Sequence, residues 1–261
     1  GADTDFFRLP FPNDIRMKDG HVDLSGFPTP GPGIVGFDPV QRIMDAAAQV
    51  QTGFSTEPVI TFRLSHGFKL ETIRATDESG PATLYFRNID KGSPQYNWTP
   101  DYAYFVTDGG SAYICPRYVT VRPTWNGPLL PGTTYAVILA RGIETTGGVE
   151  LGATDDMQAM LSAVPPDPGS AALAAWNAYT KLRDYVADPV SGIAGERVIG
   201  AAVFTTQRVD DVIPALRQAI NEAPFAAPDG LTECKAGVTS PCDDGLDGER
   251  RHGKPQPPPI R

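Results

Sequence analysis

The chain has 261 residues and a formal net charge of −9. So acidic a chain offers little cationic surface to nucleic acid or to an anionic membrane, which argues against both as partners. Hydrophobic residues make up 41% of the chain, enough for a buried core, while no run approaches the roughly 18 apolar residues of a membrane span. The 27 glycines and 26 prolines favour short extended segments separated by turns.

Residues 1–55 form a Pro- and Gly-rich N-terminal segment. Its aromatic stretch at 6–14 (FFRLPFPND) is predicted to lie across a core and to insert phenylalanine rings into it, and residues 20–24 predict a short strand. Asp38 followed by Pro39 predicts a helix start, and the helix would continue to about residue 52 and pack on the remainder of the fold. One face of that helix would carry Val40, Ile43, Met44 and Ala47.

Residues 56 to about 151 predict a succession of short strands with turn residues between them. In residues 134–140, successive side chains alternate between two faces, as in a half-buried antiparallel strand. Residues 70–73 predict a short turn or helix, and residues 108–110 (DGG) predict a hairpin turn. The predicted strands are 59–64, 82–89, 102–106, 112–115, 118–123 and 134–140.

The hydrophobic period becomes helical in residues 154–187. Thr154 predicts the start of a short helix that ends near Val164. Residues 170–187 predict a further helix, and a strand over 197–207 and a helix over 210–221 follow. In the helix at 170–187 the repeating side chains are Leu173, Trp176, Asn177, Thr180, Leu182 and Val186.

These elements predict a mainly β fold class. The expected architecture is an Ig-like β-sandwich over 56–222, with a helical insertion at about 154–187 and a closing C-terminal strand at 197–206. Residues 1–55 would be an irregular segment with one helix packed on that sandwich. Residues 223–261 would be loop and Pro-rich linker.

The three cysteines indicate the redox environment in which the protein resides. Cys234 and Cys242 lie eight residues apart in a Pro- and Gly-containing stretch, which predicts a local disulfide and an oxidising environment; two reduced thiols are the alternative. Cys115 follows an apolar residue and predicts a buried free thiol. Zinc is not expected, because no second close pair of Cys or His supplies four ligands. The acidic residues 243–249 (DDGLDGE) predict a solvated loop, with a calcium site as the alternative.

Two further places in the sequence carry residues suited to binding or catalysis. Tyr96 and Trp98 lie in a predicted exposed loop, where aromatic rings can contact a glycan or a protein; packing against the core is the alternative. Ser65 and His66 are adjacent, and neighbouring residues of a strand point to opposite faces, so no catalytic pair is expected. The glycines of 31–36 match a nucleotide-binding pattern by letters, but no strand precedes them.

Four short segments carry a resemblance to a known family. They are Phe11-Pro12-Asn13-Asp14, residues 53–56 (GFST), residues 131–135 (PGTTY) and residues 201–207 (AAVFTTQ). In their order and spacing, the chain resembles the N-terminal domain of bacterial surface lipoprotein lipases and related large secreted esterases. The resemblance covers residues 6 to about 215. It implies an Ig-like sandwich with a helical insert, followed in those proteins by an α/β-hydrolase domain.

The chain departs from that family at the catalytic residues. It contains no Gly-x-Ser-x-Gly, the strand-to-helix turn that exposes a serine nucleophile, so those catalytic residues have no positions here. The sequence therefore predicts a non-catalytic accessory domain, without cofactor or metal, that braces or presents a C-terminal esterase or lipase module. An exported location follows: outer-membrane surface, periplasm or extracellular space. The alternatives are a surface binding module for glycan or protein, and a stand-alone hydrolase with an unrecognised site.

Overall fold

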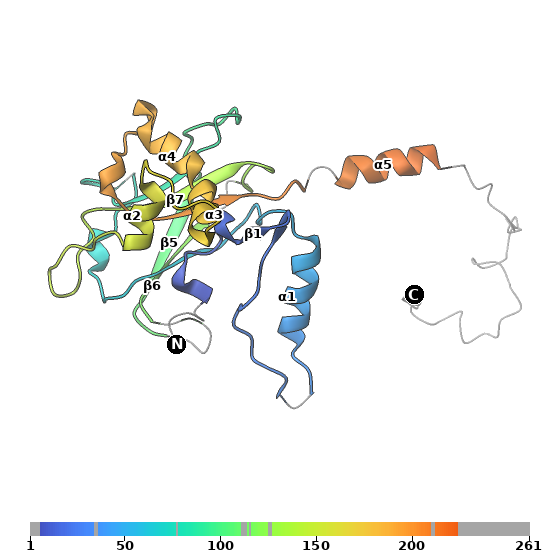
Figure 1. Cartoon of the computed structure of the whole chain (residues 1–261), viewed down its shortest axis with the longest axis horizontal. Helices are drawn as coiled ribbons and strands as arrows, with labels where there is room; N and C mark the ends of the chain where they lie inside the picture. Colours follow the sequence, from blue (N-terminus) through green and yellow to red (C-terminus); the bar gives the residue numbers. More distant parts are fainter. Residues whose placement is uncertain are drawn as a thin grey trace, which may run out of the picture. The chain divides into compact units, whose positions relative to one another are not determined.

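The computed structural model describes residues 6–33, 36–76, 78–110, 114, 116–124, 127–209 and 212–223. It contains small antiparallel sheets and more helix than strand, so the described chain is mixed α/β rather than plainly mainly β (Figure 1). The chain forms two compact units, Gly1–Val212 and Ile213–Arg261. Among the described residues, all three sheets lie in the first unit, and so do all helices except α5 (Val212–Glu222), of which all but the first residue lies in the second.

Two three-stranded antiparallel sheets form the centre of the first unit. Their strand orders are β3-β6-β5 and β4-β7-β8. The strands lie where the alternating pattern predicts them, except for the predicted strand 112–115: residues 112, 113 and 115 are outside the described residues, and Ile114 is not in a strand. The bounds are β3 Ile60–Arg63, β4 Leu84–Asn88, β5 Tyr102–Thr107, β6 Tyr118–Pro123, β7 Thr134–Ala140 and β8 Val198–Thr205.

The main hydrophobic core lies between the two sheets. Phe62 of β3 and Val119 of β6 belong to the same buried cluster as Phe86, Tyr135 and Phe204 of the other sheet. The rings of Tyr135 and Phe204 are stacked with centroids 6.1 Å apart, and Phe86 packs edge-on against both. Aromatic rings in these orientations add to the stabilisation that burial of their area provides.

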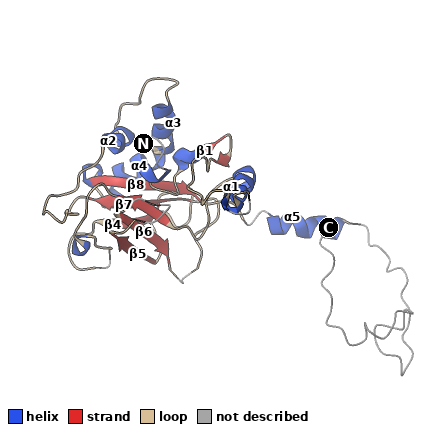
Figure 2. Ribbon diagram, turned by 90° about the horizontal axis from the view of Figure 1, so that it is seen from below, coloured by secondary structure: helices blue, strands red, loops and turns tan. Residues whose placement is uncertain are grey.

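Strand β7 is buried on both faces, which corrects the prediction of a half-buried strand. All seven of its residues are buried. Figure 2 shows why: the helices α2, α3 and α4 cover the face of β4-β7-β8 that is turned away from the other sheet. Side chains from that face join a second buried cluster with residues of α2 and α4. The sheet is therefore the middle of three layers.

The helices begin at capping residues of the expected types. Asp38, Thr154 and Ser170 each accept a hydrogen bond from a backbone N–H of the first helical turn. The segment 170–187, predicted as one helix, is two helices that meet at Tyr179. The break lets the Tyr179 ring enter the interior, where only 2% of it is exposed. The bounds are α1 Pro39–Val50, α2 Asp155–Leu161, α3 Ala171–Ala178, α4 Thr180–Ala187 and α5 Val212–Glu222.

The N-terminal segment packs its rings into the core as predicted. Phe6, Phe7, Phe11 and Phe27 form one aromatic cluster, and Phe11 contacts Phe54 beside the end of β8. The short elements here are η2 Phe6–Arg8, η3 Asp14–Arg16, β1 Met17–Lys18 and β2 His21–Val22, and η5 Leu70–Thr72, η6 Pro189–Ser191 and η7 Gly195–Arg197 occur later.

Helix α1 turns its apolar face inward only in part. Met44 and Ala47 pack against the core, but Ile43 is 61% exposed, contrary to the predicted face. The reason is local: α1 contacts mainly the short strand β2, which is too small to cover the whole stripe. Among the described residues, none of the helices has both the length and the apolar character needed to cross a bilayer.

Candidate functional site

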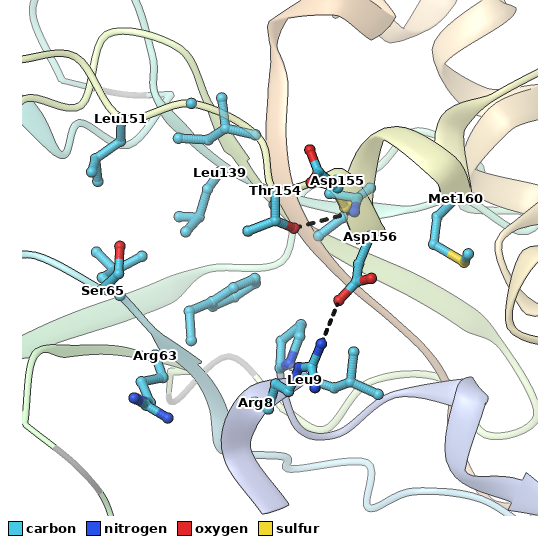
Figure 3. Close-up of a pocket in the computed structure, with 18 of the residues that line it drawn as sticks. Arg8, Leu9, Arg63, Ser65, Leu139, Leu151, Thr154, Asp155, Asp156 and Met160 are labelled. Atoms are coloured by element: carbon cyan, nitrogen blue, oxygen red, sulfur yellow. Dashed lines mark hydrogen bonds and ion pairs between the residues drawn. The ribbon is translucent and has the colours of Figure 1, made fainter. Parts of the chain in front are cut away.

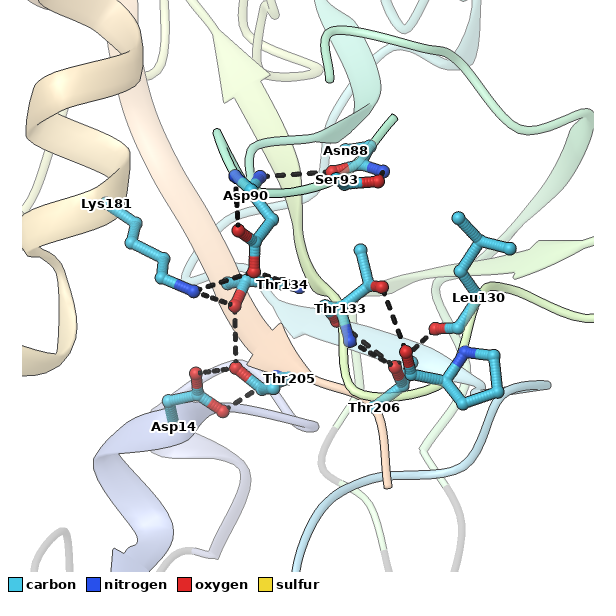
Figure 4. A network of polar contacts seen from close by, with 12 residues as sticks. Asp14, Asn88, Asp90, Ser93, Leu130, Thr133, Thr134, Lys181, Thr205 and Thr206 are labelled. Atoms are coloured by element: carbon cyan, nitrogen blue, oxygen red, sulfur yellow. Dashed lines mark hydrogen bonds and ion pairs between the residues drawn. The ribbon is translucent and has the colours of Figure 1, made fainter. Parts of the chain in front are cut away.

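Three of the four segments that carry the family resemblance, at 11–14, 131–135 and 201–207, meet in one polar network (Figure 4). Asp14 of η3 accepts hydrogen bonds from the backbone N–H of Thr205 at 2.8 Å and from its hydroxyl at 2.7 Å. The Thr205 oxygen lies 2.9 Å from the Thr134 hydroxyl, which in turn accepts from Lys181 Nζ at 2.7 Å. Lys181 also pairs with Asp90 at 2.8 Å. A directed chain of hydrogen bonds thus runs from the Lys181 ammonium to the Asp14 carboxylate.

A second set of contacts fixes the end of β8 beside this network. Thr206 accepts from the N–H of Thr133 and donates to the carbonyl of Leu130 at 2.6 Å. Gln207 N–H donates to the carbonyl of Phe54 at 2.7 Å. Gly53 is required for this approach, because a Cβ there would lie 2.8 Å from two backbone atoms of Gln207. The last strand of the unit is therefore held from both sides.

The pKa values of the two carboxylates in the network, Asp14 and Asp90, are shifted in opposite directions. Burial raises the pKa of Asp14, and the hydrogen bonds from Thr205 offset only part of that rise. Burial also opposes ionisation of Asp90, but its bonds to Lys181 and to the Gly92 N–H outweigh burial and lower its pKa. The Thr205 hydroxyl is therefore an important stabiliser of the ionised form of Asp14.

Replacement of Thr205 by valine should destabilise the fold by about 1–3 kcal/mol, because the shape is kept while a partly buried carboxylate loses a donor. The pKa of Asp14 would rise further. A carboxyl group whose pKa is higher in the folded than in the unfolded state lowers the free energy of unfolding as the pH rises from the unfolded-state pKa to the folded-state pKa. The loss should therefore be largest at neutral pH and shrink below about pH 4, where Asp14 is protonated in folded and unfolded chains alike.

Urea unfolding at pH 7 and at low pH measures this difference. Thr205→Ser keeps the hydroxyl and is the matched control, for which we expect little change from the parent chain. Equal losses for the valine variant at both pH values would show that the hydroxyl does not serve the Asp14 carboxylate.

A pocket of about 550 Å³ lies in the first unit (Figure 3). Leu139 and Leu151 lie along it, Arg63 and Ser65 come from the end of β3, and α2 contributes Asp156, which pairs with Arg8 at 3.3 Å. No pattern in the sequence predicted this pocket directly. One signal was present, since an isolated glycine, Gly200, interrupts the strand pattern of 198–204 (VIGAAVF) and lines the pocket.

Ser65 and His66 are hydrogen-bonded, contrary to the expectation that their side chains point apart. The Ser65 hydroxyl lies 2.8 Å from His66 Nδ1. Strand β3 ends at Arg63, so the alternation of a strand does not extend to these residues. Both are exposed, and in the described part of the chain no carboxylate is found bonded to the His66 ring to orient it as in a catalytic triad.

The predicted contact loop places its two aromatic residues differently. The Tyr96 hydroxyl donates to Asp188 at 3.1 Å, and its ring packs edge-on against Tyr185 of α4. Burial raises the pKa of Tyr96 to about 12, and the Asp188 carboxylate adds to the rise. Trp98 is 44% exposed. Trp98 is thus the residue of the pair that is open to a partner, and binding there stays a prediction.

No protein-family model matches the chain, and no curated protein is significantly similar to it. The resemblance to lipase N-terminal domains therefore rests on the four segments alone. Within the described residues, no group of three or more His, Cys, Asp or Glu side chains could hold a metal ion. Cys115, Cys234, Cys242 and the acidic stretch 243–249 lie outside the described residues, so the predicted disulfide and loop stay predictions.

Proposed function

We propose that the chain is a non-catalytic N-terminal accessory domain of an exported bacterial protein. Its two sheets would correspond to an Ig-like sandwich, with the helices of 155–187 as the insertion. Its role would be to brace or present a C-terminal α/β-hydrolase module at the outer-membrane surface, in the periplasm or outside the cell. The likeness to lipase N-terminal domains supplies the class of module.

The observation that carries the proposal is the fixation of the last strand. Asp14, Thr133 and Gly53 come from three of the four resembling segments, and all of them secure residues 205–207. A domain that positions a following module needs a firmly held exit, because any freedom at the last strand would pass directly to that module. The network supplies such an exit.

The test is to identify the native gene product and measure its ester hydrolysis. We expect an intact mass well above 27.9 kDa, with a Gly-x-Ser-x-Gly beyond Arg261 and turnover of a chromogenic ester. The 261-residue chain alone should give no turnover. A native product that ends at Arg261 would contradict the proposal and favour a free-standing binding protein for glycan or protein.

The Ser65–His66 contact favours a second candidate, a stand-alone hydrolase. Its hydroxyl-to-imidazole distance of 2.8 Å is within the hydrogen-bond reach that a serine nucleophile and its base require, and Ser65 lines the pocket. This candidate predicts turnover by the chain alone that Ser65→Ala abolishes and Ser65→Cys alters. Turnover that persists in Ser65→Ala would rule out this pair as its source.

A further inference from the structure

The pocket lies in the seam between the edges of the two sheets. β3 and β8 are end strands of their sheets, and both contribute residues to it. The N-terminal segment closes part of the same seam: Phe11 pairs with Thr61 of β3, and Asp14 bonds to Thr205 of β8. The pocket is the part that this segment leaves open, with α2 along its side. Its volume of about 550 Å³ falls in the range of small-molecule sites.

The inner wall of the pocket is apolar. The Tyr179 hydroxyl of this wall already has hydrogen-bond partners in the protein. It donates to the Ala201 carbonyl at 2.6 Å and accepts from Asn13 at 2.8 Å. A sugar or nucleotide placed against this wall would lose hydrogen bonds to water and gain none from the protein, whereas an alkyl chain has no hydrogen bonds to lose. The buried side chains of this wall are Phe62, Leu139, Met157, Met160, Tyr179 and Ile199.

Gly200 keeps the pocket open. It is opposite Leu139 in the β7–β8 pairing, and a Cβ at this position would find only Leu139 atoms within 4 Å, both at 3.9 Å. The backbone of Gly200 has no positive φ, so a side chain would fit without strain. A glycine that neither the backbone nor its neighbours require leaves room for something else at this place.

The mouth of the pocket is polar and balanced in charge. It carries two arginines, Arg8 and Arg63, and two aspartates, Asp155 and Asp156, and all four are exposed. Arg8 and Asp156 form an ion pair there, and Ser65 adds a hydroxyl. Two cations beside two carboxylates give no net attraction for an ionic head group, so an uncharged polar head is the best match.

We propose that this pocket binds a neutral single-chain amphiphile, with the alkyl chain along the apolar wall and an uncharged head group at the mouth. The inference goes beyond the accessory role and does not depend on it. An ester of a fatty acid with a polyol has this chemistry.

The first experiment titrates the 261-residue chain with 1-decanoylglycerol below its aggregation concentration, in a calorimeter. We expect one site, and about fourfold tighter binding for each methylene added until the chain fills the pocket, after which affinity stays constant. Decanoate and decyltrimethylammonium should each bind more weakly than the neutral ester. Absence of saturable binding, or a preference for either ion, would overturn the proposal.

The second experiment fills the pocket. Gly200→Val should weaken binding of 1-decanoylglycerol at least tenfold while the melting temperature stays the same or rises. Gly109→Val is the matched control, since Gly109 is exposed in a turn and its Cβ would meet nothing within 4 Å. Equal binding by a folded Gly200→Val variant and the parent chain would overturn the assignment to this pocket. If Gly200→Val does not fold, the chain-length series in the parent still decides.

Discussion

Replacement of Phe204 by alanine should reduce the free energy of unfolding by about 3–5 kcal/mol. Phe204 is completely buried in the core between the two sheets. Its ring stacks on Tyr135, packs near Phe86 and contacts Phe54 edge-on at 6.5 Å. Alanine would leave a cavity that three rings on different elements cannot fill together without moving from their own partners.

Phe54 gives this substitution a further consequence. It links β8 to the aromatic cluster of the N-terminal segment through Phe11. Urea unfolding measures the loss, and hydrogen exchange should show the amides of residues 6–16 exchanging faster than in the parent chain. Phe105→Ala removes the same side chain from the outer face of β5, where it is 52% exposed, and should change stability by less than about 0.5 kcal/mol. Equal effects of the two substitutions would contradict the placement of Phe204 in the core.

The strands could be predicted from the sequence because each is short, alternating and bounded by turn residues. Residues 118–123 and 134–140 match β6 and β7 residue for residue. Helix starts could be predicted equally well, because Asp38, Thr154 and Ser170 cap their helices through hydrogen bonds to residues two or three positions along the chain. Signals of this kind are local, and a single sequence contains them in full.

The features that the sequence did not predict depend on tertiary contacts. Alternation in 134–140 indicates two faces of β7 but not that α4 covers the second one. The periodicity of 170–187 continues through Tyr179, but two helices meet there, and the Tyr179 hydroxyl bonds to Asn13 and Ala201, which are distant in the sequence. Ile43 was predicted to face inward but is exposed. The apolar face of α1 could be recognised in the sequence, but not that β2 is too small to cover it.

The candidate sites show the same limit. The resembling segments could be recognised by their letters, but the bond between Asp14 and Thr205 joins residues 191 positions apart. The pocket is formed by six separate parts of the chain, at 8–15, 62–65, 139, 151–160, 179 and 199–201, and Gly200 was its one local signal. The contact of Ser65 with His66 was predicted wrongly because the end of β3 was placed beyond Arg63.

Replacement of Leu182 by alanine should reduce the free energy of unfolding by about 2–5 kcal/mol. Leu182 of α4 is fully buried in the cluster between the helices and the sheet β4-β7-β8. Ala136 and Ile138 of β7 and Val203 of β8 belong to the same cluster, so the side chain covers the second face of the sheet. The substitution tests the three-layer arrangement directly. If helix α4 did not cover the second face of β7, truncation of Leu182 would cost little stability.

Thermal and urea unfolding measure the effect of Leu182→Ala. Leu70→Ala is the matched control, because Leu70 is 55% exposed on η5 and its truncation should cost little. The core of Phe204 lies on the opposite face of the same sheet, so the losses of Leu182→Ala and Phe204→Ala should add to within about 0.5 kcal/mol in the double variant. A single cooperative transition in all variants would show that both layers unfold with the sheet. A separate early transition in Leu182→Ala would instead show that the helices form a layer the sheet does not require.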